Sequence, residues 1–338
     1  MSSSALRPVP DVSRLPAELS LKIYDLMLRA RLLEERLITM YKQGDGYFWI
    51  GGPGEEAFNV PLGLLADKGE GRDHDFLHLH YRSTGTLLAM GADPVDSLRQ
   101  MKNTITDPYS KGRNFAGHFS VRKWNVIPVS SPIEVQFSIA IGTARAQRAA
   151  KGISIVQGGD AGTAEGDFAT ALVWASRKGC ELPLLMIVTN NRFGISTPYA
   201  GQHGYEQISE RGKAFGMPTA VVDGNDFEAS YTALKTAMDY VRKERKPYLL
   251  EAMVSRLRGH SSASGANLVK DEIDCLDVIE QRLEARSLLT RAQMAKMRED
   301  ITNELADAAK RIRTEPQPEA SNIWDYVFAD KNYVGGEG

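Results

Sequence analysis

Two oxygen-bearing side chains, Asp160 and Asn191, each follow a short apolar run, and the chain between them turns into a helix. If both runs are parallel strands, these side chains meet at the carboxyl edge of the sheet, where open α/β sheets bind ligands. The free N–H groups at the start of the helix favour an anion. One carboxylate and one amide oxygen beside an anion suit Mg²⁺, which completes its shell with phosphate oxygens and water. The pattern therefore predicts a site that holds a diphosphate through a metal ion.

The elements that must position these residues form a strand–helix–strand unit. Residues 153–156 and 182–188 are apolar, as in buried strands, and residues 165–178 between them are typical of a helix that Gly179 stops. The same alternation continues downstream, with strands expected at 219–224 and 248–255 and a helix at 227–242. We therefore expect an α/β fold with a doubly wound, mostly parallel sheet flanked by helices.

The order Gly-Asp, helix, Asn-Asn resembles the cofactor motif of thiamine-diphosphate enzymes. The resemblance implies that Asp160, Asn191 and the backbone carbonyl of Phe193 bind Mg²⁺. It also implies that the turn at Ala161 and Gly162 holds the diphosphate. Ala161 stands where the motif has a glycine, and alanine tolerates fewer turn conformations.

Two other interpretations of this stretch remain open. A buried strand–helix–strand unit without any ligand has the same apolar strands and glycine turns. A nicotinamide-binding Rossmann unit fits less well, because the turn lacks G-x-G-x-x-G and the second strand ends in Asn rather than an acidic residue.

A further strand is expected at 76–80, and Tyr81 and Arg82 follow it. An arginine there can bind phosphate with two parallel hydrogen bonds, although a lone arginine is usually a surface charge. The segment HLHYR-STG is similar to the Tyr-Arg diphosphate contact of the α subunits of 2-oxo acid dehydrogenases. The three histidines within 74–80 do not have a typical metal-ligand spacing.

Residues 107–124 are polar and read as a long loop, and Ser131 and Ile133 precede a small-residue helix at 137–150. The order K-G-R, H, S-S-P-I resembles the branched-chain type of 2-oxo acid dehydrogenase α subunit. That resemblance implies that Ser131 contacts the cofactor and that the backbone of Ile133 lies near its aminopyrimidine ring. The family has a monovalent-cation site at this segment, but Val135 replaces the expected hydroxyl residue, so no such cation is predicted.

His260 lies in a Ser/Gly-rich loop after the last expected strand. Alone it reads as an exposed loop histidine, whereas the resemblance implies a cofactor-binding, catalytic histidine, a role that its near-neutral pKa suits. Two aspartates that follow in the family are absent, with Gly265 and Ala266 in that region. Ser261 matches a residue phosphorylated in mitochondrial members, and nothing in this sequence indicates that regulation.

The N-terminal part of the chain predicts a helix that Ser20 caps and that Gly44 ends. Arg31 and Glu34 lie off its apolar stripe, so we expect them to be solvated. Glu55 and Glu56 open the next helix and are interpreted as partners of its dipole. Between these helices and in the strand expected at 76–80, the following residues are candidates to line a substrate pocket: Phe48, Trp49 and His80.

The C-terminal part is helical and charged. Thr290 and Gln293 form a capping box, and apolar residues from Met294 to Ile312 form one stripe that indicates packing against the core or another subunit. The aromatic tail 323–328 is a candidate partner anchor. We divide the chain into an N-terminal arm and helix (1–45), the cofactor-binding α/β domain (46–272) and a helical extension (273–338).

The chain has 338 residues, a formal charge of −2 and two cysteines. Its pI of about 6.3 gives no support for a nucleic-acid partner. The cysteines form no metal or disulfide pattern. No apolar leader or membrane-spanning stretch is evident, so a cytoplasmic protein is expected.

Taken together, the motifs resemble the E1 α subunit of a branched-chain 2-oxo acid dehydrogenase. Such an enzyme decarboxylates a small 2-oxo acid on thiamine diphosphate and passes the acyl group to a lipoylated E2 acyltransferase. The family places the glutamate that activates the cofactor on a β subunit, so the resemblance implies an α₂β₂ heterotetramer that is inactive without β. The alternatives are the α subunit of a pyruvate or acetoin dehydrogenase, and a non-catalytic homologue that binds a nucleotide or a partner.

Overall fold

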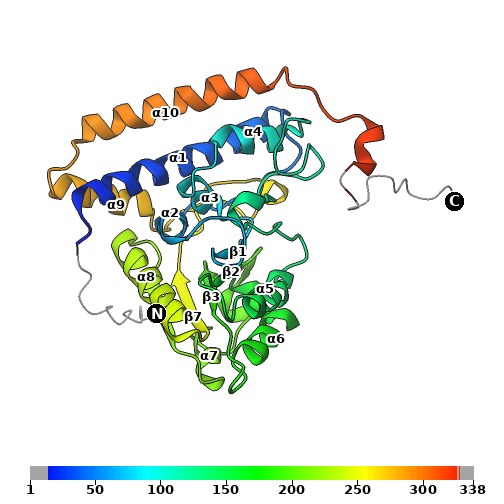
Figure 1. The fold of residues 1–338 in the computed structure, drawn as a ribbon. Coiled ribbons are helices and arrows are strands. Elements are labelled where there is room, and N and C mark those ends of the chain that lie inside the picture. Colours follow the sequence, from blue (N-terminus) through cyan, green and yellow to red (C-terminus); the bar gives the residue numbers. More distant parts are fainter. Residues whose placement is uncertain (1–13, 326, 328–338) are drawn as a thin grey trace.

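The computed structural model describes residues 14–325 and 327. Its centre is a parallel sheet of five strands, with helices around it (Figure 1). The strand order is β1-β2-β3-β7-β6, with every neighbouring pair parallel. Two two-residue strands pair separately, outside this sheet. The sheet strands are β1 (Phe76–His78), β2 (Ser154–Gly159), β3 (Leu184–Asn190), β6 (Thr219–Asp223) and β7 (Tyr248–Met253). The separate strands are β4 (Phe193–Gly194) and β5 (Thr197–Pro198).

Helices cover both faces of the sheet. This is required because successive side chains of β3 point to opposite faces and all of them are buried. Leu184, Met186 and Val188 pack in one core with α5 (Val135–Ala146) and α6 (Gly166–Ala175). Leu185 and Ile187, which point the other way, share a second core with α2 (Glu56–Leu65) and α8 (Phe227–Glu244). The doubly wound α/β fold expected from the sequence is confirmed.

A further layer of helices packs beyond α2, and α10 runs alongside α1 (Figure 1). These helices are α1 (Ala17–Lys42), α3 (Thr84–Ala89), α4 (Pro94–Lys102), α9 (Cys275–Ala285) and α10 (Arg291–Ile312); the short α7 (Glu210–Ala214) lies by β6. The predicted stripe from Met294 to Ile312 is buried in the core that contains α1, and the Thr290–Gln293 capping box is present. The two terminal helical segments therefore belong to the body of the protein.

Several element ends differ from the sequence prediction. Pro16, not Ser20, is the N-cap of α1; Ser20 lies inside the first turn, where its hydroxyl donates to the carbonyl of Pro16 at 3.0 Å. Helix α6 ends at Ala175, before Gly179, and β1 ends at His78 rather than at residue 80. Gly44 does follow α1 with a positive φ of 78°, as a helix stop requires.

Within the described residues, no helix is both long and apolar enough to cross a membrane. In the tail, Ile323 and Trp324 are more than half exposed, as a partner anchor requires. Tyr326 and Phe328 of the same candidate anchor, and residues 1–13 of the N-terminal arm, lie outside the described residues.

Candidate active site

The register of the sheet brings Asp160 and Asn191 to one edge. Gly159 of β2 pairs with Thr189 of β3, so the residues that follow leave the sheet side by side. The backbone N–H of Asn191 hydrogen-bonds the Asp160 carboxylate. The two side chains are almost fully buried, at 1% and 6% exposure. The convergence expected from the sequence is therefore found.

The oxygen atoms at this edge suit a hard cation. Oδ2 of Asp160 is buried and has no hydrogen-bond partner among the described residues. Burial raises the pKa of Asp160 to about 6, against the pull of backbone N–H groups, so a cation would stabilise its ionised form. Asn191 Oδ1 accepts the N–H of Phe193 at 3.1 Å, which fixes the amide. The strand partner of Phe193 is Pro198, which has no N–H to donate to the Phe193 carbonyl.

The described residues contain no group of three or more His, Cys, Asp and Glu side chains that could hold a metal ion. A site at Asp160 must therefore use amide, carbonyl and ligand oxygens, as Mg²⁺ sites with bound phosphates do. The residues present fit the metal and diphosphate that the sequence motif implies.

The turn after Asp160 has a neighbour that the sequence did not single out, Glu134. A Cβ added to Gly162 would lie 2.0 Å from its carboxylate, and one added to Gly158 would lie 2.1 Å from it. Glu134 is 1% exposed and has a left-handed backbone, with φ at 64°. Burial raises its pKa to about 8, so the carboxyl is mainly protonated at neutral pH and does not repel an anion at the turn.

Arg82 is a buried cation near Asp160, and four other residues contact its guanidinium. Its Nη1 donates to the carbonyl of Gly51, and its Nη2 lies 3.1 Å from Nδ1 of His260. The guanidinium lies 5.1 Å from the centre of the Tyr81 ring, and Nε lies 3.7 Å from Glu55. Tyr81, Arg82 and His260, predicted from separate motifs, thus form one cluster.

His260 is half-buried and neutral. Burial lowers its pKa to about 4, helped by repulsion from Arg82 and Arg256. Because a guanidinium only donates hydrogen bonds, Nδ1 must accept from Arg82, so the ring proton lies on Nε2. His260 is therefore an Nε2–H donor with its other nitrogen occupied.

Arg256 is a second cation of the site that sequence reasoning did not assign. It lies 4.9 Å from the centre of the Phe193 ring and donates to the carbonyl of Ile195 at 2.8 Å. Its charge interacts with those of Arg82 and Asp160. Its place just after β7 was the available signal, because it follows a strand at the ligand-binding edge. Arg256 thus adds a second cation beside Asp160, at the edge where an anion is expected.

Ser131 is linked to the cluster of Tyr81, Arg82 and His260 by His118, a residue to which the sequence analysis gave no role. Its Oγ is 3.0 Å from Nε2 of His118, whose ring stacks on Tyr81 at 6.5 Å. Ile133, His80, Tyr81 and Glu134 line one small cavity. The predicted cofactor residues on this segment therefore lie next to the Tyr81 cluster.

The three candidate substrate residues do not share one environment. The His80 ring is 3.8 Å from that of Tyr81, and Phe48 meets Phe115 edge to face at 5.0 Å, beside His118. Trp49, by contrast, is fully buried and donates its indole N–H to Glu34 at 2.7 Å. The prediction that Trp49 lines a pocket is wrong, because its polar end is already satisfied inside the core.

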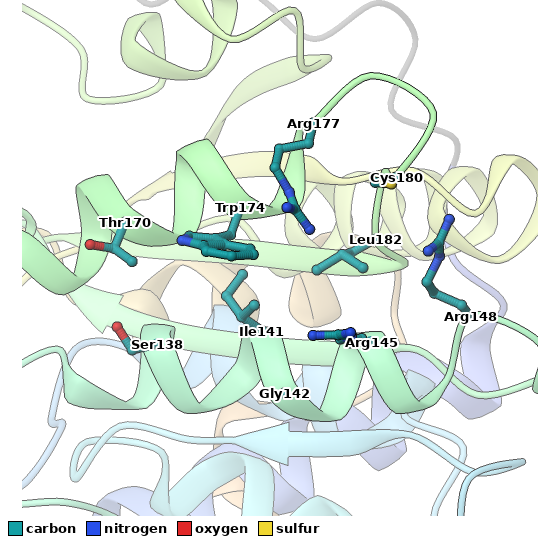
Figure 2. A pocket seen from close by; sticks show the side chains of 10 residues that line it. All are labelled: Ser138, Ile141, Gly142, Arg145, Arg148, Thr170, Trp174, Arg177, Cys180 and Leu182. Atoms are coloured by element: carbon teal, nitrogen blue, oxygen red, sulfur yellow. The ribbon is translucent and has the colours of Figure 1, made fainter.

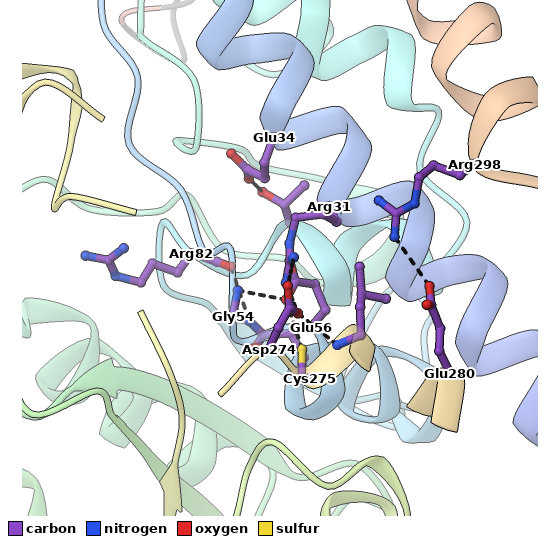
Figure 3. Close-up of polar contacts among 12 residues, drawn as sticks. Arg31, Glu34, Gly54, Glu56, Arg82, Asp274, Cys275, Glu280 and Arg298 are labelled. Atoms are coloured by element: carbon purple, nitrogen blue, oxygen red, sulfur yellow. Dashed lines mark hydrogen bonds and ion pairs between the residues drawn. The ribbon is translucent and has the colours of Figure 1, made fainter. Parts of the chain in front are cut away.

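Arg31 and Glu34 are not solvated, contrary to the sequence prediction. Arg31 makes a paired bond to Glu56, at 2.7 and 3.0 Å, and a second pair to Asp274 (Figure 3). Glu34 accepts from Trp49 and from Thr84, each at 2.7 Å. The prediction assumed that only the apolar face of the helix is buried. Helix α1 is instead covered by α2, α3, α9 and α10, so Arg31 and Glu34 are buried as well.

Glu55 and Glu56 are also more than dipole partners. Glu56 is the buried counter-ion of Arg31 and accepts from the N–H of Gly54 at 2.8 Å. Glu55 is 1% exposed and faces Arg82. The glycine turn at 51–54 is thus tied to α1 on one side and to the candidate site on the other.

A cavity of about 360 Å³ lies away from this cluster, between α5 and α6 (Figure 2). Arg145, Arg148 and Arg177 border it, and Trp174 forms part of its wall. None of the predicted site residues lines it. It is a surface feature of the α5–α6 face and not part of the candidate active site.

Comparison with known proteins places this geometry in a family. The model of the dehydrogenase E1 component family matches residues 24–321. The chain belongs to this dehydrogenase E1 component family. Proteins of the family depend in general on thiamine diphosphate, in agreement with the diphosphate site expected at Asp160.

Individual relatives within the E1 family include 2-oxoisovalerate dehydrogenase subunits alpha. The chain is 30% identical to that of Bacillus subtilis (strain 168) over 91% of its own length and 94% of the relative's. It is 32% identical to the mitochondrial protein of Caenorhabditis elegans over 80% of its length, and spans 63% of that protein. The human mitochondrial protein is 26% identical over 94% of this chain and 72% of its own length. The predicted resemblance to branched-chain E1 α subunits is confirmed.

Proposed function

We propose that this chain is the α subunit of a branched-chain 2-oxo acid dehydrogenase that acts on 3-methyl-2-oxobutanoate with thiamine diphosphate and Mg²⁺. The similarity to 2-oxoisovalerate dehydrogenase subunits alpha covers nearly the whole chain and supports this assignment. The observation that carries the metal site is the carboxylate of Asp160: it accepts the backbone N–H of Asn191, while its buried Oδ2 has no hydrogen-bond partner among the described residues.

Asp160, Asn191 and the carbonyl of Phe193 are the proposed Mg²⁺ ligands. Tyr81, Arg82 and the Ala161–Gly162 turn are assigned to the diphosphate, while Ser131 and Ile133 are assigned to the rest of the cofactor. When bound, thiamine diphosphate supplies an electron sink for the loss of carbon dioxide from a 2-oxo acid.

The protein's own groups supply charge, orientation and a proton donor. Arg82 and Arg256 compensate anionic groups at the edge of the sheet. His260 presents Nε2–H as a donor, held by Arg82 at Nδ1, and can orient an oxygen of the substrate or guide the incoming lipoyl group. Phe48 and His80 are the proposed substrate contacts, and the packing of Phe48 on Phe115 gives that side of the site an apolar wall.

The proposal includes two protein partners. A β subunit would supply the glutamate that activates the cofactor in an α₂β₂ assembly, and a lipoylated E2 acyltransferase would receive the acyl group. The relatives named as subunits alpha support a multi-subunit enzyme. We place the enzyme in the cytoplasm.

Co-expression with candidate β subunits, followed by a decarboxylation assay, tests the proposal. The complex is expected to act faster on 3-methyl-2-oxobutanoate than on pyruvate, and the α chain alone is expected to be inactive. A preference for pyruvate or acetoin would reassign the substrate within the family. Full activity of the isolated chain would contradict the two-subunit assignment.

A further inference from the structure

Glu55 has an oxygen that the structure leaves without a partner. Its side chain is 2% exposed, and Oε2 makes no hydrogen bond within the part of the chain that the structure describes. Burying a carboxylate is costly unless it is paired, and Arg82, with Nε at 3.7 Å from Oε1, is its cation. Buried pairs of this kind often add no more stability than an apolar side chain of similar size, which favours a functional role for the charge.

The backbone holds Glu55 in place. Its N–H donates to the carbonyl of Gly52 at 3.0 Å, and its own carbonyl accepts the N–H of Asn59 at 2.9 Å in the first turn of α2. The carbonyl of Arg82 accepts from the side chain of Asn59 at 3.2 Å, so the two chain segments are also joined directly. A fixed carboxylate beside a long, flexible cation restricts where the guanidinium can lie.

Glu55 differs from its neighbour Glu56 in what it touches. Glu56 is paired with Arg31 and the N–H of Gly54, which are structural contacts between α1 and α2. The charged or titratable groups that face Glu55 are Arg82, Glu56, Asp160 and Tyr81. Apart from Glu56, these are residues of the candidate site.

We infer that Glu55 is a positioning residue that holds the Arg82 guanidinium against Tyr81, with Nη2 on Nδ1 of His260. The inference rests on the proposed function for its consequence, namely that the diphosphate meets an arginine whose orientation is set in advance. Preorganising a charged donor strengthens binding because less freedom is lost when the ligand arrives.

The test compares full-length Glu55→Leu and Glu55→Gln with a matched variant, Glu228→Gln. Glu228 is also a buried glutamate paired with an arginine, Arg282, at 2.9 Å, but it lies by α8 and α9. The first readout is the pKa of His260, from the pH titration of its ring resonances by NMR. The second is the dissociation constant for thiamine diphosphate in the presence of Mg²⁺, by calorimetry.

Glu55→Leu is expected to free Arg82, which raises the pKa of His260 by about one unit because a repelling cation moves away. Cofactor binding is expected to weaken about tenfold or more, as when one partner of a buried ionic contact is removed. Glu55→Gln keeps the shape of the side chain but removes its charge, so it should move both properties in the same direction as Glu55→Leu, because the contact with Nε at 3.7 Å is an ion pair. Glu228→Gln should leave both unchanged.

An unchanged His260 pKa in folded Glu55→Leu protein would overturn the inference, as would equal effects in Glu228→Gln, which would indicate a general loss of stability. If the wild-type chain, purified in complex with its β subunit, binds no thiamine diphosphate but Glu55→Leu still shifts the His260 pKa, the positioning role stands and the proposed function fails.

Discussion

Hydrogen bonds within the protein set the orientation and protonation state of the side chains of the site before any ligand binds. His260 illustrates this, because its Nδ1 is engaged by Arg82 and its pKa is lowered to about 4, first by burial. A histidine in a Ser/Gly-rich loop would ordinarily be exposed and would titrate near pH 6.5. The fold thus converts a pH-sensitive group into a neutral donor of fixed orientation.

At the residue scale we predict the state of this ring. With ¹⁵N-labelled histidine, the spectrum of the full-length chain at pH 7 should show His260 as the neutral tautomer protonated at Nε2. Arg82→Gln should raise its pKa, because both the repelling charge and part of the packing are lost. A charged ring at pH 7, or a proton on Nδ1 in the wild-type chain, would contradict the assigned hydrogen bond.

Helix α1 carries the support for this site from outside the sheet. Its Arg31 links Glu56 at the start of α2 to Asp274 at the start of α9, and its Glu34 links Trp49 to Thr84, beside Arg82. A Cβ on Gly51 would lie 2.1 Å from the Glu34 carboxylate, so the glycine turn packs directly on this helix. The N-terminal helix therefore fixes the loop that accepts from Arg82.

At the element scale, Arg31→Met tests this support. The change leaves two carboxylates without their shared cation, and Glu56 is buried, so the free energy of unfolding should fall by about 3–5 kcal/mol. Adding Glu56→Gln should recover part of the loss, since the unpaired charge is then removed. Urea denaturation followed by circular dichroism measures both.

A suitable control is Thr290→Ala, which removes the cap of α10 and should cost about 1 kcal/mol. If Arg31→Met is no more damaging than this exposed cap, the buried pair does not support the site as described.

The same elements explain what the sequence could and could not predict. Strands β2 and β3 were recognisable because they are almost fully buried and therefore largely apolar, and their parallel order puts Asp160 and Asn191 together. The burial of Arg31 and Glu34 was not predictable from periodicity, because their partners lie far away in the chain at Asp274 and Thr84. The position of Glu134 beside the Asp160 turn was not predictable either, because it depends on a left-handed backbone conformation of Glu134 that no sequence motif specifies.

At the scale of the whole molecule, buried histidines and buried glutamates change the free energy of unfolding in opposite directions as the pH rises. His78 and His260 have pKa values lowered by burial to about 3 and about 4, so their contribution is lost as the pH falls below 6.5. Glu34, Glu55 and Glu134 have pKa values raised by burial to about 7, 7 and 8, so their contribution is lost as the pH rises toward those values. Above pH 6.5 only the second effect remains among these groups.

We therefore predict that the free energy of unfolding falls between pH 6.5 and pH 8. Each raised carboxyl group contributes a slope of at most about 1.4 kcal/mol per pH unit. Glu134→Gln should flatten the fall between pH 7 and 8, whereas Glu228→Gln should not. Urea denaturation at half-unit steps from pH 5 to 8.5 measures this, and a stability that keeps rising to pH 8 would show that these carboxyls are ionised in the folded protein.

The central claim is that Asp160 and Asn191 converge on one metal ion that holds a diphosphate. Calorimetric titration of the full-length chain with thiamine diphosphate, with and without Mg²⁺, tests it most directly in wild-type, Asp160→Ala and the neighbouring control Asp167→Asn. We predict Mg²⁺-dependent binding to the wild type and the control, and a loss of at least about a hundredfold in affinity for Asp160→Ala. Binding that is independent of Mg²⁺, or unchanged in Asp160→Ala, would contradict the account.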